Sequence, residues 1–180
     1  MSLEDDVRRL MDRQEIVDLN HRLCFLIDTF QLERMVQEIY SENGSDDHGG
    51  GPVVGREAIR AWYEDSTANV AAVSHNISNI LIDFHSDTRA TMRSNVTTWT
   101  WTMANAHLGP LRNADYSLSL SYIDEVSKYP EDGWRIDSRL LVSNTSKTGD
   151  ASIIAVGTLP ESQTGIQALS RREAPGSPAA

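Results

Sequence analysis

The spacing of hydrophobic residues changes partway along the chain from a helical period to a strand period. Apolar residues recur at three-, four- and five-residue steps from Leu3 to Ile27, which predicts a long first helix with Ser2 as its N-cap. The segments QLERMVQEIY and 55–73 predict two further helices. The Gly- and Asp-rich stretch between them, ENGSDDHGGGP, predicts a loop or a short edge strand.

Beyond residue 74, β-branched and aromatic residues predict strands. HNISNILIDF and RATMRSNVTTWTWTM form a predicted hairpin across the turn HSDT, and YSLSLSYIDEV and WRIDSRLLV predict two more strands. Three helices followed by a four-stranded antiparallel meander indicate an α+β fold. The pattern weakens past about residue 145. We therefore predict one domain over residues 1–145 and a C-terminal extension, 146–180, that is at least partly disordered.

Composition narrows the range of partners. The formal net charge is -10 and the pI is about 4.8, so electrostatic binding to nucleic acid or to an anionic membrane is not expected. Cys24 is the only cysteine, which excludes an internal disulfide. The sequence has neither a stretch of roughly 20 apolar residues nor the pattern of a secretory signal. We expect a cytoplasmic soluble protein.

Asp28 is the most informative polar residue. It ends the segment LCFLID, which is apolar on every side and therefore predicts a buried helix end. A buried carboxylate needs a hydrogen-bond donor. His75, which opens the first long strand, can donate one ring N–H to Asp28 and leave its other nitrogen free to act as a base. In the alternative, Asp28 lies at the surface or caps the next helix, and His75 is a core histidine.

A second set of residues predicts a ligand cavity. Tyr116, Leu118, Leu120 and Tyr122 alternate with serines and face one way, with Trp134 expected nearby. Such an apolar wall with a few polar groups is typical of a ligand site, although the same residues also fit a plain core. Alternation along the strand places Asn79 on the face of His75, where it either orients a substrate oxygen or bonds to a neighbouring loop. Trp62 on the third helix is also expected to contact a substrate.

We do not expect a metal or an organic cofactor. Asp46, Asp47 and His48 in SDDHGGG are potential metal ligands. Adjacent residues in a flexible glycine loop seldom converge on one ion, however, and no second histidine stands at helical spacing. The segment GGGPVVG lacks the GK[ST] ending of a phosphate-binding loop.

The order of the elements, FLID at the end of the first helix, SHNISN at the start of the first long strand and DGWRIDSR in the last strand resemble the SnoaL-like branch of the nuclear transport factor 2-like superfamily. The resemblance covers roughly residues 5–145. It implies a cone-shaped α+β barrel, in which three N-terminal helices pack on a curved antiparallel sheet around an apolar cavity. Several members place an Asp and a His where Asp28 and His75 stand. Arg139 matches an arginine that lies in the pocket of one member; an exposed salt bridge with Asp137 or Asp124 is the alternative.

The resemblance implies a cofactor-independent acid/base enzyme, of dehydratase, isomerase or cyclase type, acting on a small hydrophobic carbonyl or hydroxyl compound. Either His75 or Asp28 is the base, and Tyr122 or Asn79 holds the oxyanion. The alternative is a non-catalytic module, similar to the small subunits of aromatic-ring dioxygenases, or a carrier of apolar ligands. The resemblance also implies a homodimer formed through the convex sheet face, with Thr98, Trp99 and Thr100 as candidate interface residues.

Overall fold

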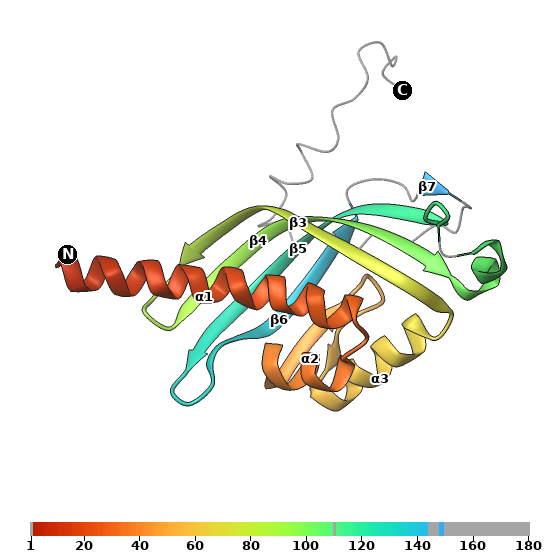
Figure 1. Ribbon diagram of the computed structural model, residues 1–180. Helices are drawn as coiled ribbons and strands as arrows, with labels where there is room; N and C mark the ends of the chain where they lie inside the picture. The colour runs from red at the N-terminus through yellow and green to blue at the C-terminus, as the bar shows by residue number, and fades with distance from the viewer. Residues whose placement is uncertain (1, 110, 144–147, 150–180) are drawn as a thin grey trace, which may run out of the picture.

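The computed structural model describes residues 2–109, 111–143 and 148–149. Three helices precede the long strands, as the sequence predicts, and lie against a curved sheet (Figure 1). They are α1 (Leu3–Asp28), α2 (Leu32–Ile39) and α3 (Arg56–Thr67). The prediction of a third helix over 55–73 is too long, because the residues from Val70 onward belong to the strand β3 (Val70–Phe84). The long helix α1 runs across the sheet (Figure 1). Helices α2 and α3 lie together near the C-terminal end of α1.

The strands are β1 (Tyr40–Asp47), β2 (Val53–Val54), β3 (Val70–Phe84), β4 (Arg89–Thr102), β5 (Tyr116–Tyr129), β6 (Gly133–Ser143) and β7 (Thr148–Gly149), the last paired with β5. A short 3₁₀ helix, η1 (Met103–Leu108), follows β4.

The sheet has the strand order β2-β1-β6-β5-β4-β3 and is not closed into a barrel. The predicted meander is confirmed, because β3 to β6 are consecutive antiparallel neighbours. The sheet as a whole is mixed, since β1 runs parallel to β6.

The Gly- and Asp-rich segment after α2 forms the strand β1, which is longer than the short edge strand considered from the sequence. Parallel pairing with β6 and antiparallel pairing with β2 supply its backbone hydrogen bonds. A Cβ atom at Gly44 would come within 3.0 Å of the Ile136 carbonyl oxygen. Glycine is therefore required here by the close approach of two backbones, and the segment is part of the sheet.

The two halves of α1 have different surroundings. Ser2 caps the helix through a capping box with Asp5, as expected, but the first apolar residues, Leu3, Val7, Leu10 and Met11, remain exposed. Burial begins at Asp12 and Ile16 and continues to Ile27. Leu23, Cys24, Leu26 and Ile27 are buried, which confirms the predicted buried helix end, although Phe25 is 59% exposed.

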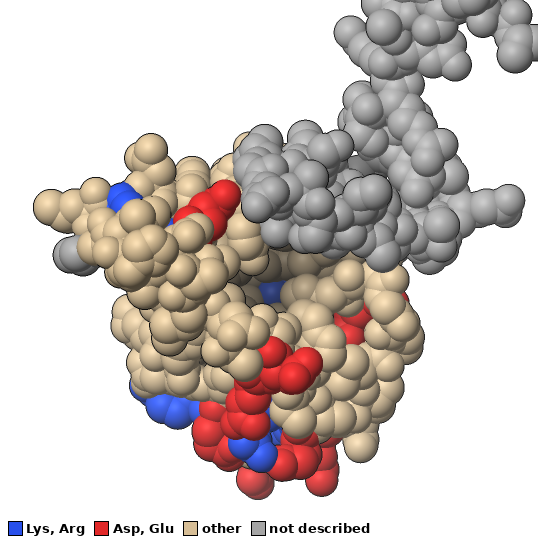
Figure 2. Space-filling view, turned by 90° about the vertical axis from the view of Figure 1, so that its right-hand side faces the viewer, with Lys and Arg blue, Asp and Glu red and all other residues tan. Residues whose placement is uncertain are grey.

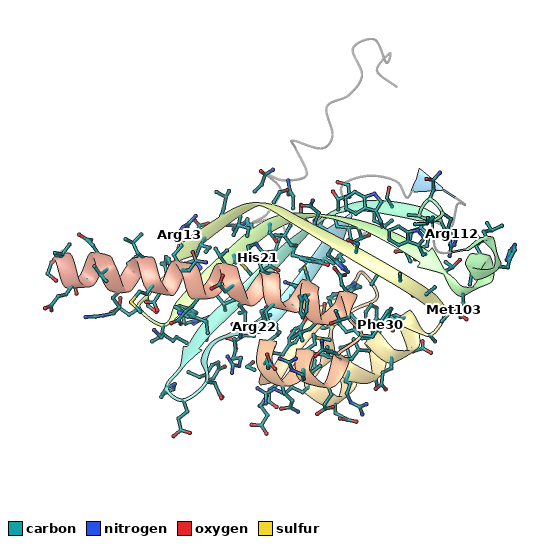
Figure 3. All side chains as sticks on the ribbon, in the orientation of Figure 1. Arg13, His21, Arg22, Phe30, Met103 and Arg112 are labelled. Carbon is teal, nitrogen blue, oxygen red and sulfur yellow. The ribbon has the colours of Figure 1, made fainter. Side chains whose placement is uncertain are left out.

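The main hydrophobic core lies between the helices and the concave face of the sheet. It contains Ile16, Met35, Ile59 and Ile136, all 0% exposed. The exposed His21 and Arg22 lie on the outer side of α1 (Figure 3). No helix in the described ranges has both the length and the apolar composition that a membrane crossing requires. Apart from residues 148–149, the predicted disordered extension lies outside the described residues.

Candidate active site

The end of α1 meets the first half of β3 through two contacts of a single carboxylate. Asp28 Oδ1 lies 2.5 Å from His75 Nδ1, and Asp28 Oδ2 accepts the His75 backbone N–H at 3.0 Å. Because β3 is the edge strand of the sheet, that N–H is free of strand pairing and available to the helix. The two contacts fix the orientation of the imidazole with Nδ1 toward Asp28. The second ring nitrogen, Nε2, does not contact this carboxylate. The His75 side chain is 8% exposed and the Asp28 side chain 24% exposed.

His75 forms part of the wall of a cavity of about 330 Å³. Tyr116, Leu118, Leu120 and Tyr122 of β5 line it, as the strict alternation of that strand predicts, and Trp62 of α3 faces them. Burial raises the pKa of the Tyr122 phenol well above its ordinary value, so the hydroxyl stays protonated. Figure 2 shows a hollow at the end of the molecule where α3 and the start of β3 lie, bordered mostly by uncharged residues.

Strand β4 supplies two further polar groups to this cavity. Thr98 pairs directly with His75 in the β3–β4 register, and both Thr98 and Thr100 are 5% exposed and line the cavity. The expectation that these two threonines lie on the convex face is therefore wrong. Trp99 points to that opposite face and is 36% exposed. Thr98 Oγ1 is buried and has no hydrogen-bond partner among the residues that the structure describes, which leaves it available to a ligand.

Asn79 does not lie on the face of His75. The β3–β4 register shifts between Ser78 and Leu81, and Asn79 is exposed with a φ of 52°. A bulge adds one residue to a strand and so reverses which side chains face inward after it. Ile77 and Ile80 face the core on either side of the bulge. The expectation that Asn79 borders the cavity is wrong for this reason, and its amide suits the left-handed conformation.

Trp134 lies outside the cavity as well. It is 3% exposed, packs at 6.0 Å against Phe84, and donates its indole N–H to Asp12 Oδ1 at 3.0 Å. Phe84 ends β3 and Asp12 belongs to the N-terminal half of α1, so Trp134 belongs to the opposite end of the core from His75. The expected substrate contact is replaced by a structural one.

Arg139 lies behind the cavity wall. Its guanidinium forms a bidentate ion pair with Asp124, with both N–O distances 2.7 Å, and stacks 3.9 Å from the centre of the Tyr122 ring. Burial alone would lower the pKa of Arg139, but the Asp124 carboxylate outweighs it and holds that pKa above its ordinary value. The alternative of a salt bridge with Asp124 is correct, except that the pair is buried and not exposed.

A second carboxylate–imidazole pair lines the same cavity, and the sequence analysis missed it. His48 Nε2 lies 3.0 Å from Asp46 Oδ1 and 3.3 Å from the Tyr63 hydroxyl. Asp46 Oδ2 accepts the hydroxyls of Tyr40 at 2.5 Å and Tyr63 at 3.0 Å. The His48 ring also packs against Trp62, with the ring centres 4.3 Å apart.

The charge of Asp46 is well supported although the residue is 2% exposed. Burial alone would raise its pKa, but His48, Arg139 and the Tyr40 hydroxyl outweigh that effect and hold the pKa below its ordinary value. Burial and the nearby Asp46 charge raise the pKa of Tyr40 and Tyr63 well above the usual range, so both phenols remain hydrogen-bond donors. The carboxylate therefore stays ionised beside His48.

The spacing of Asp46 and His48 in the sequence is the signal that could have identified this pair. In a strand, residues two apart point to the same side, and Asp46 and His48 follow this period at the end of β1. Asp47, between them, turns away and accepts the backbone N–H groups of Gly49 and Gly51 at 2.7 and 3.1 Å. Within the described ranges, no three His, Cys, Asp or Glu side chains gather closely enough to hold a metal ion.

Known structures share this architecture. A candidate scytalone dehydratase from Novosphingobium aromaticivorans is 23% identical, with a TM-score of 0.71 and coverage of 84% of this chain and 96% of its own. A hexachlorocyclohexane dehydrochlorinase from Novosphingobium barchaimii is 18% identical, with a TM-score of 0.68 and coverage of 86% and 99%. A candidate aromatic ring hydroxylase from Novosphingobium aromaticivorans is 20% identical, with a TM-score of 0.67 and coverage of 78% and 94%.

At these identities the structural likeness establishes the fold. A comparison with curated protein sequences finds no significant match. The sequence pattern of the SnoaL-like domain matches residues 8–140, a range that contains both carboxylate–imidazole pairs and every described residue of the cavity wall except Leu141. The chain belongs to the SnoaL-like domain family.

Proposed function

We propose that this protein is a cofactor-independent acid/base enzyme, of dehydratase, isomerase or cyclase type, that acts on a small hydrophobic carbonyl or hydroxyl compound. The observation that carries the proposal is the Asp28–His75 pair at the wall of an apolar cavity. The cavity volume of about 330 Å³ is at the lower end of the usual range for ligand sites, roughly 300–1,000 Å³. Small, largely apolar substrates suit it.

The pair gives each residue a distinct part in proton transfer. With Nδ1 donating to Asp28, the second nitrogen of His75, Nε2, is the lone-pair acceptor of the neutral ring. It removes a proton from the carbon beside a carbonyl group. The Asp28 carboxylate then stabilises the imidazolium that forms, as a charged partner of a hydrogen bond does. Thr98, directly opposite His75, and the protonated hydroxyl of Tyr122 are placed to donate hydrogen bonds to a substrate oxygen.

The competing non-catalytic interpretations make different predictions. An assembly module of the dioxygenase small-subunit type is expected to fill the pocket with its own side chains, whereas the described residues leave a cavity here. A carrier of apolar ligands would bind its ligand equally well with and without His75 and would not convert it. A measurement of turnover therefore distinguishes an enzyme from a carrier.

The test is a screen of small enones, epoxides and β-hydroxy ketones, followed by Asp28→Asn and His75→Ala on any compound that is converted. Each substitution should lower kcat/KM by roughly 10²- to 10⁴-fold, the usual contribution of a positioned acid/base group. The double variant should lose little more than either single one, because the two residues act as a unit. Circular dichroism checks that each variant folds.

His21→Ala is the matched control, because it removes an exposed imidazole on the outer side of α1 (Figure 3). It should leave kcat/KM within about twofold of the wild type, as expected of a surface substitution. Full activity in either Asp28→Asn or His75→Ala would overturn the proposed function. Binding of a screened compound with equal affinity by wild type and His75→Ala, with no turnover of any compound, would identify a carrier.

A further inference from the structure

The Asp46–His48 pair has no part in the mechanism above, yet it also sets an imidazole beside a carboxylate. One ring nitrogen lies 3.0 Å from Asp46 Oδ1 in His48 (Nε2) and 2.5 Å from Asp28 Oδ1 in His75 (Nδ1). The contact is a hydrogen bond in His75, whereas His48 Nε2 makes its hydrogen bond to the Tyr63 hydroxyl and meets Asp46 at ion-pair distance. The other nitrogen, Nδ1 in His48 and Nε2 in His75, has no hydrogen-bond partner within the part of the chain that the structure describes. Both imidazoles line the same cavity.

The surroundings of His48 place a buried negative charge beside its ring. The Asp46 carboxylate is ionised and is held by the hydroxyls of Tyr40 and Tyr63, with the Arg139 guanidinium as a second positive neighbour. In such surroundings a carboxylate stabilises an imidazolium more strongly than it does in water. Trp62 packs against the ring of His48, and an aromatic ring also favours a neighbouring cation. His48 is therefore suited to donate a proton from Nδ1.

We propose that His48 is a second catalytic residue, which protonates the oxygen that leaves the substrate while His75 removes the proton from carbon, and that the substrate is a β-hydroxy carbonyl compound. This inference rests on the proposed function and selects dehydration from the three reaction types. It assigns the base to the wall formed by α1 and β3 and the acid to the wall formed by β1 and α3.

The reaction balances without any co-reactant. His75 Nε2 takes the proton from the carbon beside the carbonyl group, and the electron pair of that C–H bond forms the new C=C bond. The C–O bond to the β-hydroxyl group breaks, and the departing oxygen takes the Nδ1 proton of His48, so that water leaves. His75 then carries one proton more and His48 one proton fewer. The His48 side chain is 22% exposed, so exchange with solvent restores both.

The test compares two compounds that differ only in whether the leaving group needs a proton. β-Hydroxypropiophenone must lose hydroxide, a poor leaving group that requires an acid, whereas β-chloropropiophenone loses chloride, which does not. Both lose the same carbon-bound proton and give the same enone, which absorbs in the ultraviolet. His48→Ala should lower kcat for the hydroxy compound by roughly 10²-fold or more. It should change kcat for the chloro compound less than about fivefold.

The other variants separate the two proposals. His75→Ala should lose activity on both compounds, because both need the base. Asp46→Asn can still accept one phenol hydrogen bond. It should also lower kcat more for the hydroxy compound than for the chloro compound, but by a smaller factor than His48→Ala. His107→Ala, which removes an exposed imidazole in η1, is the control and should alter neither rate.

Each outcome decides one of the two proposals. Equal loss on both compounds in His48→Ala would show that His48 only shapes the wall, and no loss on either would show that it is not used. Both results would overturn the assignment of His48 while leaving the role of His75 standing. If wild type eliminates neither compound, the selection of dehydration of a β-hydroxy carbonyl compound is wrong, while the proposed acid/base function still stands on the screen. If His75→Ala retains both activities, the proposed function itself is wrong. His48 lies on the cavity wall and not in the packed core, so the decisive variant is expected to fold.

Discussion

Single side chains determine whether a buried hydroxyl is hydrogen-bonded within the protein or stays unpaired at the cavity wall. Thr98 and Thr91 occupy the same strand and are both 5% exposed, but their hydroxyls differ. Thr91 Oγ1 contacts His85 Nε2 at 2.6 Å and donates to Glu125 at 2.9 Å, whereas Thr98 Oγ1 has no partner among the described residues. An unpaired buried hydroxyl lowers the free energy of unfolding. Thr98 therefore presents an unpaired hydroxyl at the cavity wall at some cost to stability.

Thr98→Val should leave the free energy of unfolding unchanged or raise it by about 1 kcal/mol, because it removes an unpaired hydroxyl and keeps the shape of the side chain. Thr91→Val is the matched control and should lower that free energy by about 1 kcal/mol, because it leaves the groups around it unpaired. Urea unfolding of both variants measures the difference. A larger destabilisation by Thr98→Val than by Thr91→Val would contradict this interpretation.

At this scale the sequence predicts part of the site. Asp28 was identifiable because a carboxylate at the end of an apolar helix requires a partner, and His75 is that partner. The four side chains of β5 were identifiable from strict alternation. Asn79 was not, because one extra residue in β3 reverses the alternation and no local sequence pattern announces the bulge. His48 was missed because the glycines around it favour a loop, whereas Asp46 belongs to a strand.

At the scale of elements, one carboxylate ties the long helix to the β5–β6 hairpin. Asp12 of α1 accepts hydrogen bonds from Lys128 Nζ at 2.6 Å and from the Trp134 indole at 3.0 Å. Burial alone would raise the pKa of Asp12, but these two donors outweigh it and hold the pKa below its ordinary value of 3.8. The contact lies where α1 enters the core, next to its exposed first turns.

Asp12→Asn should lower the free energy of unfolding by roughly 1.5–3 kcal/mol at neutral pH, as expected for hydrogen bonds to a charged group. A carboxylate whose pKa is lower in the folded state contributes its full stabilisation above the unfolded value, 3.8, and loses it as the pH falls through the folded value. The gap between variant and wild type should therefore narrow in acid. Urea titrations from neutral pH to about pH 3 check this; a gap that stays constant would contradict it.

The elements themselves follow from the sequence except where tertiary pairing overrides local preference. Helical periodicity located α1, α2 and α3, and the strand period located the meander of β3 to β6. β1 could not be assigned as part of the sheet interior from its Gly- and Asp-rich sequence, because strand formation there depends on pairing with β6, which is distant in the sequence. Its parallel direction likewise has no local signal.

At the scale of the whole molecule, one buried charge cluster joins the helix layer to the sheet. Arg139 of β6 pairs with Asp124 of β5 and donates to Asn20 of α1 at 3.1 Å, and Asn20 donates to Ser94 of β4 at 3.0 Å. The side chains of Arg139 and Asp124 are both 0% exposed. Four elements therefore meet at a single ion pair, which fixes the position of α1 over the sheet and thereby the position of Asp28.

Arg139→Met should lower the free energy of unfolding by about 3–5 kcal/mol, because it leaves the Asp124 carboxylate buried without a counter-ion. Adding Asp124→Leu should restore part of that loss, since the uncompensated charge is then gone. The exposed pair Arg93–Asp83, at 2.5 Å, offers a control: Arg93→Met should cost at most about 1 kcal/mol. Denaturant unfolding measures all three. Additive losses in the double variant would contradict the coupling.

The division of the buried apolar residues into separate clusters has an evolutionary consequence. Leu120 and Leu141 of the cavity wall pack with Val96 in a small cluster that is separate from the large core around Ile16 and Ile136. Mutations at Leu120 and Leu141 therefore reshape one side of the cavity and leave the large core intact, whereas Ile27 and Tyr63 of the same wall belong to that core. A lineage built on this scaffold can change the shape of the cavity by drift at the first two positions, while the parts that make it foldable stay under unchanged selection.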